Sequence, residues 1–331
     1  MSMDSLITVE NLYRYYGGLC AVHDLCFEVR RGEVLGFLGP NGAGKSTTMR
    51  IIGGNLAPSA GRVLINGIDI LDQPMLAKAE LGFLPETPPL YRDLTVNEYL
   101  AYCARINRIP RAQQQAAIDS AKERCGLTAV GRRLIANLSK GYQQRVGIAQ
   151  AIIHSPSVVL LDEPTVGLDP IQIREIRTLI RDVANEHSVV LSTHILPEVQ
   201  SVCDRVQIIN RGRLVLNESI EQMREKLQAT SLLVALRTMP SISELESIAG
   251  VASAELVGDG RVRINYAATL DPSDAIVEQA VANGWGLYEL TPERMTLEQV
   301  FVDITSSDAL AHGESGASGK PAEQGSEGEA A

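Results

Sequence analysis

Long hydrophobic runs are missing from this sequence of 331 residues. No window approaches the roughly 18 to 20 consecutive apolar residues that a membrane-spanning helix needs. Residues 1–10 also lack the basic segment and the apolar segment of a secretory signal. We therefore expect a chain that neither crosses a membrane itself nor is secreted.

Positive charge and cysteine are scarce as well. The 30 Lys and Arg residues are outnumbered by 40 Asp and Glu residues, which gives a formal net charge of −10. No dense Lys/Arg run is present, so the sequence predicts no binding to nucleic acid. The five cysteines are scattered and contain no Cys-x-x-Cys pair, which predicts reduced thiols in a cytosolic protein rather than disulfides or a metal cluster. The length is sufficient for one large domain and a smaller one.

Glycine, in contrast, is concentrated in one informative stretch, G-P-N-G-A-G-K-S-T. An apolar run at 34–38, typical of a buried strand, precedes it, and residues 48–52, typical of a helix, follow it. In that context G-x-x-x-x-G-K-[ST] predicts a phosphate-binding loop rather than a flexible turn, with backbone N–H groups converging on an anion at the positive end of a helix. Lys45 supplies a charge for the β- and γ-phosphates, and the Ser46 hydroxyl suits Mg²⁺. The expected nucleotide-binding residues are Gly39, Pro40, Asn41, Gly42, Ala43, Gly44, Lys45, Ser46 and Thr47.

Two further buried runs, 157–161 and 188–192, end in polar residues. Asp162 and Glu163 follow the first run, at the carboxyl end of a predicted parallel strand, where open α/β sheets bind ligands. We expect one of these carboxylates to hold Mg²⁺ through water and the next to accept a proton from an attacking water, with a plain acidic turn as the alternative. His194 follows the second run and is expected to hydrogen-bond a phosphate, with a buried core histidine as the alternative.

Helical signals occupy residues 92–155, as an insert in the α/β core. Thr95 and Glu98 form a capping box ahead of a helix to about residue 108, and residues 111–125 predict a second helix. Ser139 stands at the N-cap of a third helix to about residue 154, whose first turn offers a second anion site. Beyond the insert, Asp169 caps a helix through about residue 186 that begins with proline.

The strands of an antiparallel β layer are predicted both before and after the phosphate loop in the sequence. Residues 7–29 alternate apolar and polar side chains, and Asn66-Gly67 is a strong hairpin signal. Tyr16 is the aromatic residue that we expect to stack on the nucleotide base in this layer, with simple packing on the sheet as the alternative.

The order of these motifs over residues 7–227 resembles the ATP-binding subunit of an ATP-binding-cassette (ABC) transporter. The resemblance implies that 39–47 is the Walker A loop, that 160–163 is the Walker B strand with Glu163 as general base, and that 138–142 is the signature. It also implies a Q-loop position for Glu86 as a catalytic and metal-binding residue, a D-loop at 167–169 that includes Asp169, a switch role for His194, and adenine stacking for Tyr16.

Two departures from the family pattern stand out. Glu86 replaces the usual Gln; its carboxylate can still ligate Mg²⁺, but it adds charge beside the phosphates. Lys140 and Tyr142 replace the third and fifth residues of Leu-Ser-Gly-Gly-Gln, whereas Ser139 and Gly141 are kept. The anion site is therefore expected to survive with altered neighbouring contacts.

The resemblance further implies a mechanism and partners. Two cassettes, either identical or paired, would pack head to tail so that Ser139 and Gly141 of one cover the Mg²⁺-ATP of the other. Separate transmembrane permease subunits would dock near Leu90, Tyr91 and Leu94, which places the protein peripherally on the cytoplasmic face of the inner membrane. The alternative is a soluble ABC ATPase acting on ribosomes or DNA, a class that generally carries two cassettes or a long coiled-coil insert. A P-loop kinase or GTPase has no use for residues 139–145 or His194.

The C-terminal third predicts a small α+β accessory domain without a catalytic constellation, suited to packing or to regulating a dimer. Its predicted strands are 232–236, 254–257, 262–266 and 286–290, and its predicted helices are 241–248, 274–283 and 297–304. With residues 295–302, this order is similar to the C-terminal extension of single-cassette bacterial exporters of the drug-efflux and gliding-motility type. Residues 306–331 carry scarcely an apolar side chain and are expected to be disordered. The expected domains are thus 1–229, 230–305 and the tail 306–331.

Overall fold

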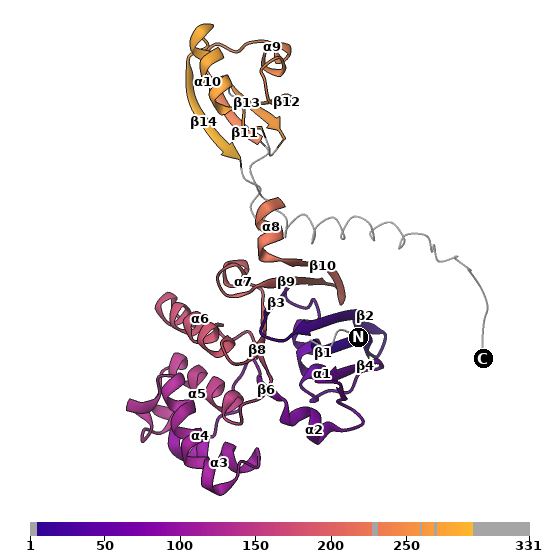
Figure 1. Cartoon of the computed structure of the whole chain (residues 1–331), viewed down its shortest axis with the longest axis vertical. Coiled ribbons are helices and arrows are strands. Elements are labelled where there is room, and N and C mark those ends of the chain that lie inside the picture. The colour runs from indigo at the N-terminus through magenta and orange to yellow at the C-terminus, as the bar shows by residue number, and fades with distance from the viewer. Residues whose placement is uncertain (1–4, 227–230, 259, 268–269, 294–331) are drawn as a thin grey trace, which may run out of the picture. The chain divides into compact units, whose positions relative to one another are not determined.

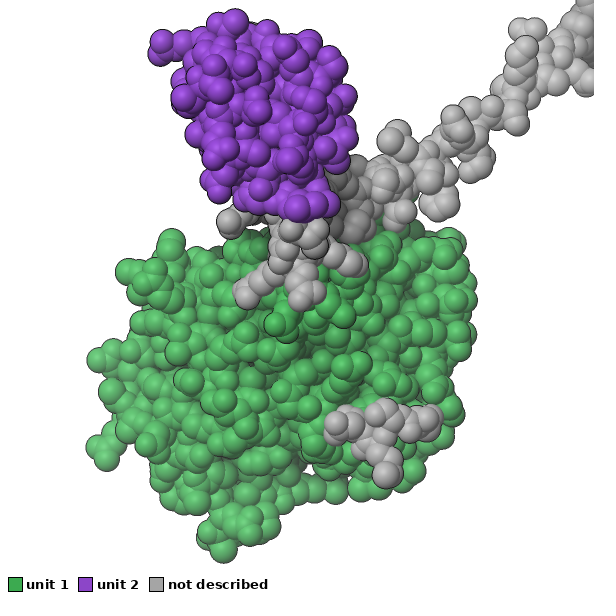
Figure 2. All heavy atoms as spheres, turned by 45° about the horizontal axis from the view of Figure 1, so that its top comes forward, with its two compact units in different colours: residues 1–226 green, residues 227–331 purple. Residues whose placement is uncertain are grey.

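The computed structural model describes residues 5–226, 231–258, 260–267 and 270–293. The chain divides into two compact units, residues 1–226 and residues 227–331, coloured separately in Figure 2. The predicted helix at 297–304, the motif at 295–302 and the tail at 306–331 lie outside the described residues. Within the described ranges, none of the helices has the length and apolar character needed to span a bilayer.

The first unit contains an antiparallel sheet, as predicted, with the strand order β2-β1-β4-β5. The hairpin between β4 and β5 turns at Asn66 and Gly67, which both have positive φ, as a tight two-residue hairpin requires. The strands are β1 (Ser5–Tyr16), β2 (Leu19–Arg30), β4 (Ala60–Ile65) and β5 (Ile68–Asp69).

A second, mostly parallel sheet forms the centre of this unit, with the order β10-β9-β3-β8-β7-β6. Every residue of β3, β7 and β8 is buried, which explains why the sequence shows these strands as continuous apolar runs. Since β3, β8, β7 and β6 are parallel neighbours, their carboxyl ends meet at one edge of the sheet. The strands are β3 (Val34–Leu38), β6 (Leu81–Leu84), β7 (Val158–Asp162), β8 (Ser188–Thr193), β9 (Arg205–Asn210) and β10 (Arg213–Ser219).

Helices cover both faces of the central sheet. The helix α1 (Lys45–Ile52) shares one hydrophobic core with the antiparallel sheet and with one face of the central sheet. On the other face, α7 (Leu196–Val202) approaches β3 at Gly36, where a Cβ atom would lie 2.9 Å from both Val199 Cγ1 and Cys203 Sγ. The remaining helices of this core are α2 (Pro74–Ala79), α6 (Pro170–Ala184) and α8 (Ile220–Lys226).

The predicted helical insert is present. It consists of α3 (Val96–Ile106), α4 (Arg111–Arg124) and α5 (Lys140–Ile152), which gather in one group in Figure 1. The capping box of α3 is formed as predicted, since Thr95 Oγ1 accepts from the Glu98 N–H at 3.2 Å and Glu98 Oε2 accepts from the Thr95 N–H at 2.8 Å.

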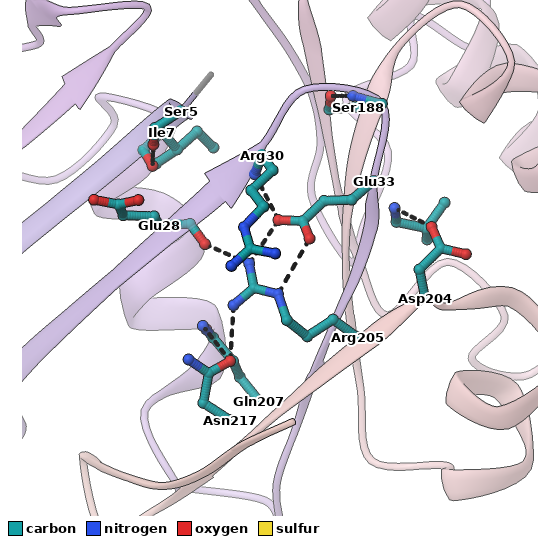
Figure 3. Close-up of polar contacts among 12 residues, drawn as sticks. Ser5, Ile7, Glu28, Arg30, Glu33, Ser188, Asp204, Arg205, Gln207 and Asn217 are labelled. Atoms are coloured by element: carbon teal, nitrogen blue, oxygen red, sulfur yellow. Dashed lines mark hydrogen bonds and ion pairs between the residues drawn. The ribbon is translucent and has the colours of Figure 1, made fainter. Parts of the chain in front are cut away.

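A polar network fastens the amino-terminal edge of the central sheet, away from the loops that follow the strands (Figure 3). Arg205 donates from Nη2 to Glu33 Oε1 at 2.6 Å and to the Glu28 carbonyl at 2.6 Å, and from Nη1 to Asn217 Oδ1 at 2.7 Å. The side chains of Arg205 and Glu33 are each 12% exposed, so this pair is well shielded from solvent. It ties the turn between β2 and β3 to β9 and β10.

The second unit follows a βαββαβ order, and its sheet has the order β12-β13-β11-β14 with every neighbouring pair antiparallel. This is the split βαβ arrangement of ferredoxin-like domains. The strand β14 continues through Pro292, beyond the predicted end at residue 290, because an edge strand tolerates proline. The elements are β11 (Ser231–Leu236), α9 (Ile242–Glu246), β12 (Val251–Gly258), β13 (Arg261–Tyr266), α10 (Ser273–Ala282) and β14 (Leu287–Glu293).

Candidate active site

Four loops meet at the carboxyl edge of the central sheet. The glycine-rich loop follows β3, Glu86 follows β6, Glu163 follows β7 and His194 follows β8. They enclose a cavity of about 410 Å³, large enough for a nucleotide. The cavity is lined by Ala21, Asn41, Gly42, Gly44, Lys45, Ser46, Thr47, Glu86, Glu163, Val166 and His194. The structure therefore brings together residues that are up to 173 positions apart, from 21 to 194.

The glycine-rich loop is shaped by its glycines. Gly42 and Gly44 have φ values of 80° and 106°, which favour glycine strongly. A Cβ at Gly44 would also lie 2.6 Å from the Ala21 carbonyl oxygen. Gly39 and Ala43 are buried, and neither is among the described residues that line the cavity, so these two shape the loop from beneath rather than facing the nucleotide space.

Lys45 is buried at the cavity floor, with 5% of its side chain exposed. Its Nζ donates to the Gly39 carbonyl at 2.8 Å and to the Pro40 carbonyl at 3.2 Å, and it lies 3.4 Å from Glu163 Oε1. The ammonium group is thus held near the N-terminus of α1, beside the space where phosphates would lie.

Asp162 and Ser46 place hard oxygen atoms next to each other. The Ser46 hydroxyl donates to Asp162 Oδ1 at 3.3 Å, and Asp162 is 3% exposed. Burial raises the pKa of the Asp162 carboxyl group. A hydroxyl and a carboxylate in contact are the oxygen ligands that Mg²⁺ prefers, so these residues fit such an ion.

Glu163 contacts both Lys45 and His194, which also line the cavity. Its Oε2 lies 2.9 Å from His194 Nδ1, and its Oε1 faces Lys45. Its backbone has a φ of 49°, in the left-handed region, and its N–H donates to the Ser192 carbonyl at 2.9 Å. Non-glycine residues in this region cluster at functional sites, where the surrounding structure holds them. A carboxylate oriented by an imidazole in this way is suited to accept a proton from water.

Glu86 and Tyr16, two further predicted site residues, are both exposed to solvent. Glu86 is exposed and lines both the nucleotide cavity and an adjoining cavity of about 360 Å³, which it shares with Lys140. Tyr16 ends β1 with 43% of its surface exposed, and Arg14 Cζ lies 4.7 Å from its ring centroid. It is not among the described residues lining the nucleotide cavity, so its stacking on a base stays a prediction.

The signature residues lie apart from the glycine-rich loop. Ser139 caps α5 as predicted, its Oγ accepting from the Tyr142 N–H at 3.4 Å, and Asp169 Oδ1 accepts from two N–H groups of α6 at 3.0 and 2.9 Å. Ser139, Gly141 and Asp169 line a separate cavity of about 270 Å³. Among the described residues, this cavity and the nucleotide cavity share none of their lining. Within one chain, the two predicted halves of the site therefore line different cavities.

One buried residue near the site was missed by the sequence reasoning. Glu198 in α7 is 1% exposed, and its carboxylate accepts from the hydroxyls of Thr165, in the loop of Glu163, and Thr193, at the end of β8 next to His194. The only signal in the sequence is an acidic residue in the first turn of a short helix, which ordinarily indicates a solvent-exposed dipole contact.

Known proteins share this architecture. A sequence model of the family described as ABC transporter matches residues 22–166. The bacitracin transport ATP-binding protein BcrA of Bacillus licheniformis is 32% identical over 310 residues, which cover 93% of this chain and 100% of that protein. The daunorubicin resistance ATP-binding protein DrrA3 of Streptomyces coeruleorubidus is 30% identical over 312 residues, covering 92% of this chain and 97% of that protein.

Solved structures agree with this assignment. A structure described as the ATP-binding subunit of an ABC transporter has a TM-score of 0.61 and 32% identity, and covers 67% of this chain and 93% of that chain. CbiO1 of Clostridium perfringens, described as part of the ABC transporter complex cbiONQ, has a TM-score of 0.62 and 30% identity, and covers 67% of this chain and 92% of that chain. The predicted fold and the predicted ATPase are thereby confirmed, and the chain belongs to the ATP-binding subunits of the ABC transporter family.

Proposed function

We propose that this ATPase binds Mg²⁺-ATP between two cassettes packed head to tail and uses it to drive export through separate permease subunits. The observation that carries the proposal is the separation of the two halves of the site. Lys45 and Glu163 line one cavity and Ser139 lines another, and a second cassette packed head to tail would bring its signature to this phosphate loop. Two relatives whose names refer to bacitracin transport and daunorubicin resistance match over more than nine-tenths of the chain, which supports the exporter type.

The chemistry follows from the side chains in the nucleotide cavity. Lys45 would leave Glu163 to bind the β- and γ-phosphates, because a triphosphate offers it more negative charge. Ser46 and Asp162 would hold Mg²⁺, which offsets phosphate charge, and Glu86 stands at the rim as a further oxygen ligand. Glu163 would then orient a water and take its proton, with His194 fixing the carboxylate at 2.9 Å. Loss of such a base typically costs about 10² to 10⁴ in rate.

The permease is proposed to dock on the exposed segment between β6 and α3. Tyr91 there is 53% exposed, and its ring lies 6.2 Å from that of Tyr99 and 5.3 Å from that of Tyr102. Leu90 lies in the cavity that also holds Glu86, so this surface adjoins the nucleotide site. A membrane protein bound there would keep the cassette at the cytoplasmic face of the inner membrane.

Mixing two inactive variants tests the head-to-tail site. Lys45→Ala disables the phosphate loop, and Ser139→Ala disables the signature, so each alone is expected to be nearly inactive. If the halves act in trans, the mixed dimer contains one site free of both changes and regains ATPase activity. Glu163→Gln should dimerise with ATP while hydrolysing it slowly. No recovery in the mixture, together with a monomeric Glu163→Gln in ATP, would refute the arrangement.

Co-purification tests the partner. Expressed with the membrane proteins encoded beside it, the tagged chain is expected to bring one of them down in detergent, and a Tyr91→Ala/Leu90→Ala variant is expected to lose it. Recovery with ribosomes or DNA in place of a membrane protein would favour the soluble-ATPase alternative instead.

A further inference from the structure

Glu198 is a carboxylate buried in α7 with both of its oxygens occupied. Oε1 accepts a short hydrogen bond from Thr165 Oγ1, and Oε2 accepts from Thr193 Oγ1 at 2.8 Å. Arg177 Nη2 lies 3.8 Å from Oε1 and supplies the opposite charge. A buried carboxylate is costly unless it is paired and hydrogen-bonded, and here each requirement is met by a named group.

The two threonines adjoin the two reacting groups: Thr165 lies in the loop that follows β7, and Thr193 is the last residue of β8. Thr165 is two residues beyond Glu163, and Thr193 immediately precedes His194; they are 2% and 0% exposed. Thr193 Oγ1 also accepts from the Ile195 N–H at 3.0 Å, which closes a turn around His194. The Glu198 carboxylate therefore links the residues next to Glu163 and His194 through hydrogen bonds to Thr165 and Thr193.

We propose that Glu198 is a positioning residue that holds Glu163 and His194 in the arrangement needed for ATP hydrolysis. Glu163 has a left-handed backbone that its surroundings must maintain, and its 2.9 Å contact with His194 depends on how the two loops are spaced. Glu198 is absent from the described residues lining the nucleotide cavity, so it acts through the loops and not on the nucleotide.

The inference rests on the proposed function of Glu163 and His194. Glu198→Ala is expected to lower kcat by about 10²-fold, since a displacement of about 1 Å costs that much, while leaving the Kd of a fluorescent ATP analogue within about threefold. Glu198→Gln, which keeps the shape and one acceptor oxygen, should recover most of kcat. Thr165→Val and Thr193→Val remove one donor each at constant shape and serve as second variants if Glu198→Ala does not fold.

Val199→Ala is the matched control. Val199 is 0% exposed on the same helix and packs toward Gly36 of β3. It should lower the melting temperature as Glu198→Ala does but leave kcat near the wild-type value. Combining Glu198→Ala with Glu163→Gln should lower kcat by less than about twofold beyond Glu163→Gln alone, because the positioned base is already missing.

The outcomes separate the two hypotheses. An equal loss of kcat in Val199→Ala, or an undiminished effect of Glu198→Ala in the Glu163→Gln background, would overturn the positioning role. A rise in the Kd with unchanged kcat would overturn it too. Wild-type protein without ATPase activity, or full activity in Glu163→Gln, would instead contradict the proposed function.

Discussion

The buried contact between Lys45 and Glu163 predicts strong energetic coupling in the nucleotide-free protein. The two side chains are 5% and 7% exposed, and their charged atoms are 3.4 Å apart. Removing one member of such a pair costs about 3–5 kcal/mol, because the other charge stays buried without its partner. The loss of unfolding free energy in Lys45→Met should fall in that range, since the carbonyls of Gly39 and Pro40 also lose their hydrogen-bond donor.

Glu163→Gln is expected to be milder, at about 1–3 kcal/mol, because the two carbonyls still bind Lys45 and the amide oxygen can accept from it. The double variant should then lose about 2 kcal/mol less unfolding free energy than the two single variants lose in sum, because residues in direct contact are energetically coupled. In a unit of this size, each kcal/mol corresponds to about 2–4 °C in melting temperature.

Urea unfolding without nucleotide, followed by far-ultraviolet circular dichroism, measures these free energies. The single tryptophan, Trp285, is buried in the second unit and supplies an internal control, because its fluorescence transition should not move in any of the three variants. Additivity of the two single changes to within about 0.5 kcal/mol would refute the coupling.

The same contact predicts the effect on ATP. In the wild-type protein, triphosphate must displace Glu163 from Lys45, whereas in Glu163→Gln the ammonium is free of that competitor. A gain of about 1.4 kcal/mol corresponds to a tenfold tighter Kd, which calorimetry with a non-hydrolysable analogue would detect. Weaker binding by the variant would contradict the idea that phosphate takes the place of the carboxylate.

Three further changes have defined outcomes. Gly44→Ala should weaken ATP binding severely, because its Cβ would lie 2.6 Å from a carbonyl oxygen of β2. The Cβ of Gly42→Ala would meet open space, so this variant should lose only about 1–2 kcal/mol of unfolding free energy, measured by calorimetry. Lys140→Glu should lower kcat/KM about two- to fivefold, whereas Lys140→Arg, which keeps the charge opposite Glu86 in the cavity that they both line, should leave it near the wild-type value. Burial holds the pKa of His187 below its ordinary 6.5, so at acidic pH the unfolded chain binds a proton there more readily than the folded chain does. The melting temperature should therefore fall as the pH drops from about 7 to 5, and it should fall less in His187→Gln.

Much of the fold was predictable because local signals agreed with it. Strands buried on both faces left continuous apolar runs, Thr95 and Ser139 left capping signatures, and Asn66-Gly67 left a turn signature. The short helices α2 and α7 were missed, since six residues and seven residues carry too little periodicity to stand out.

The nucleotide site was predictable in part for a related reason. Its residues directly follow buried strands, and neighbouring parallel strands bring their carboxyl ends together. Which of them face the cavity was not predictable, because Gly39 and Ala43 belong to the same motif as Gly42 and Gly44 yet lie beneath the loop. A motif specifies residue types at a spacing, whereas the direction of each side chain depends on backbone angles that the spacing leaves open.

Glu198 shows the limit most clearly, because its partners lie 33 and 5 residues away and approach it only when β7, β8 and α7 have packed. Its residue type in a first helical turn is ordinary, and the helix α7 that carries it packs closely against β3 at Gly36. A side chain at Gly36 would push α7 outward and pull the carboxylate from both threonines. Gly36→Ala should therefore lower kcat as well as stability, although Gly36 is neither in the nucleotide cavity nor in a recognised motif, and assays of ATP hydrolysis beside thermal unfolding would separate the two effects.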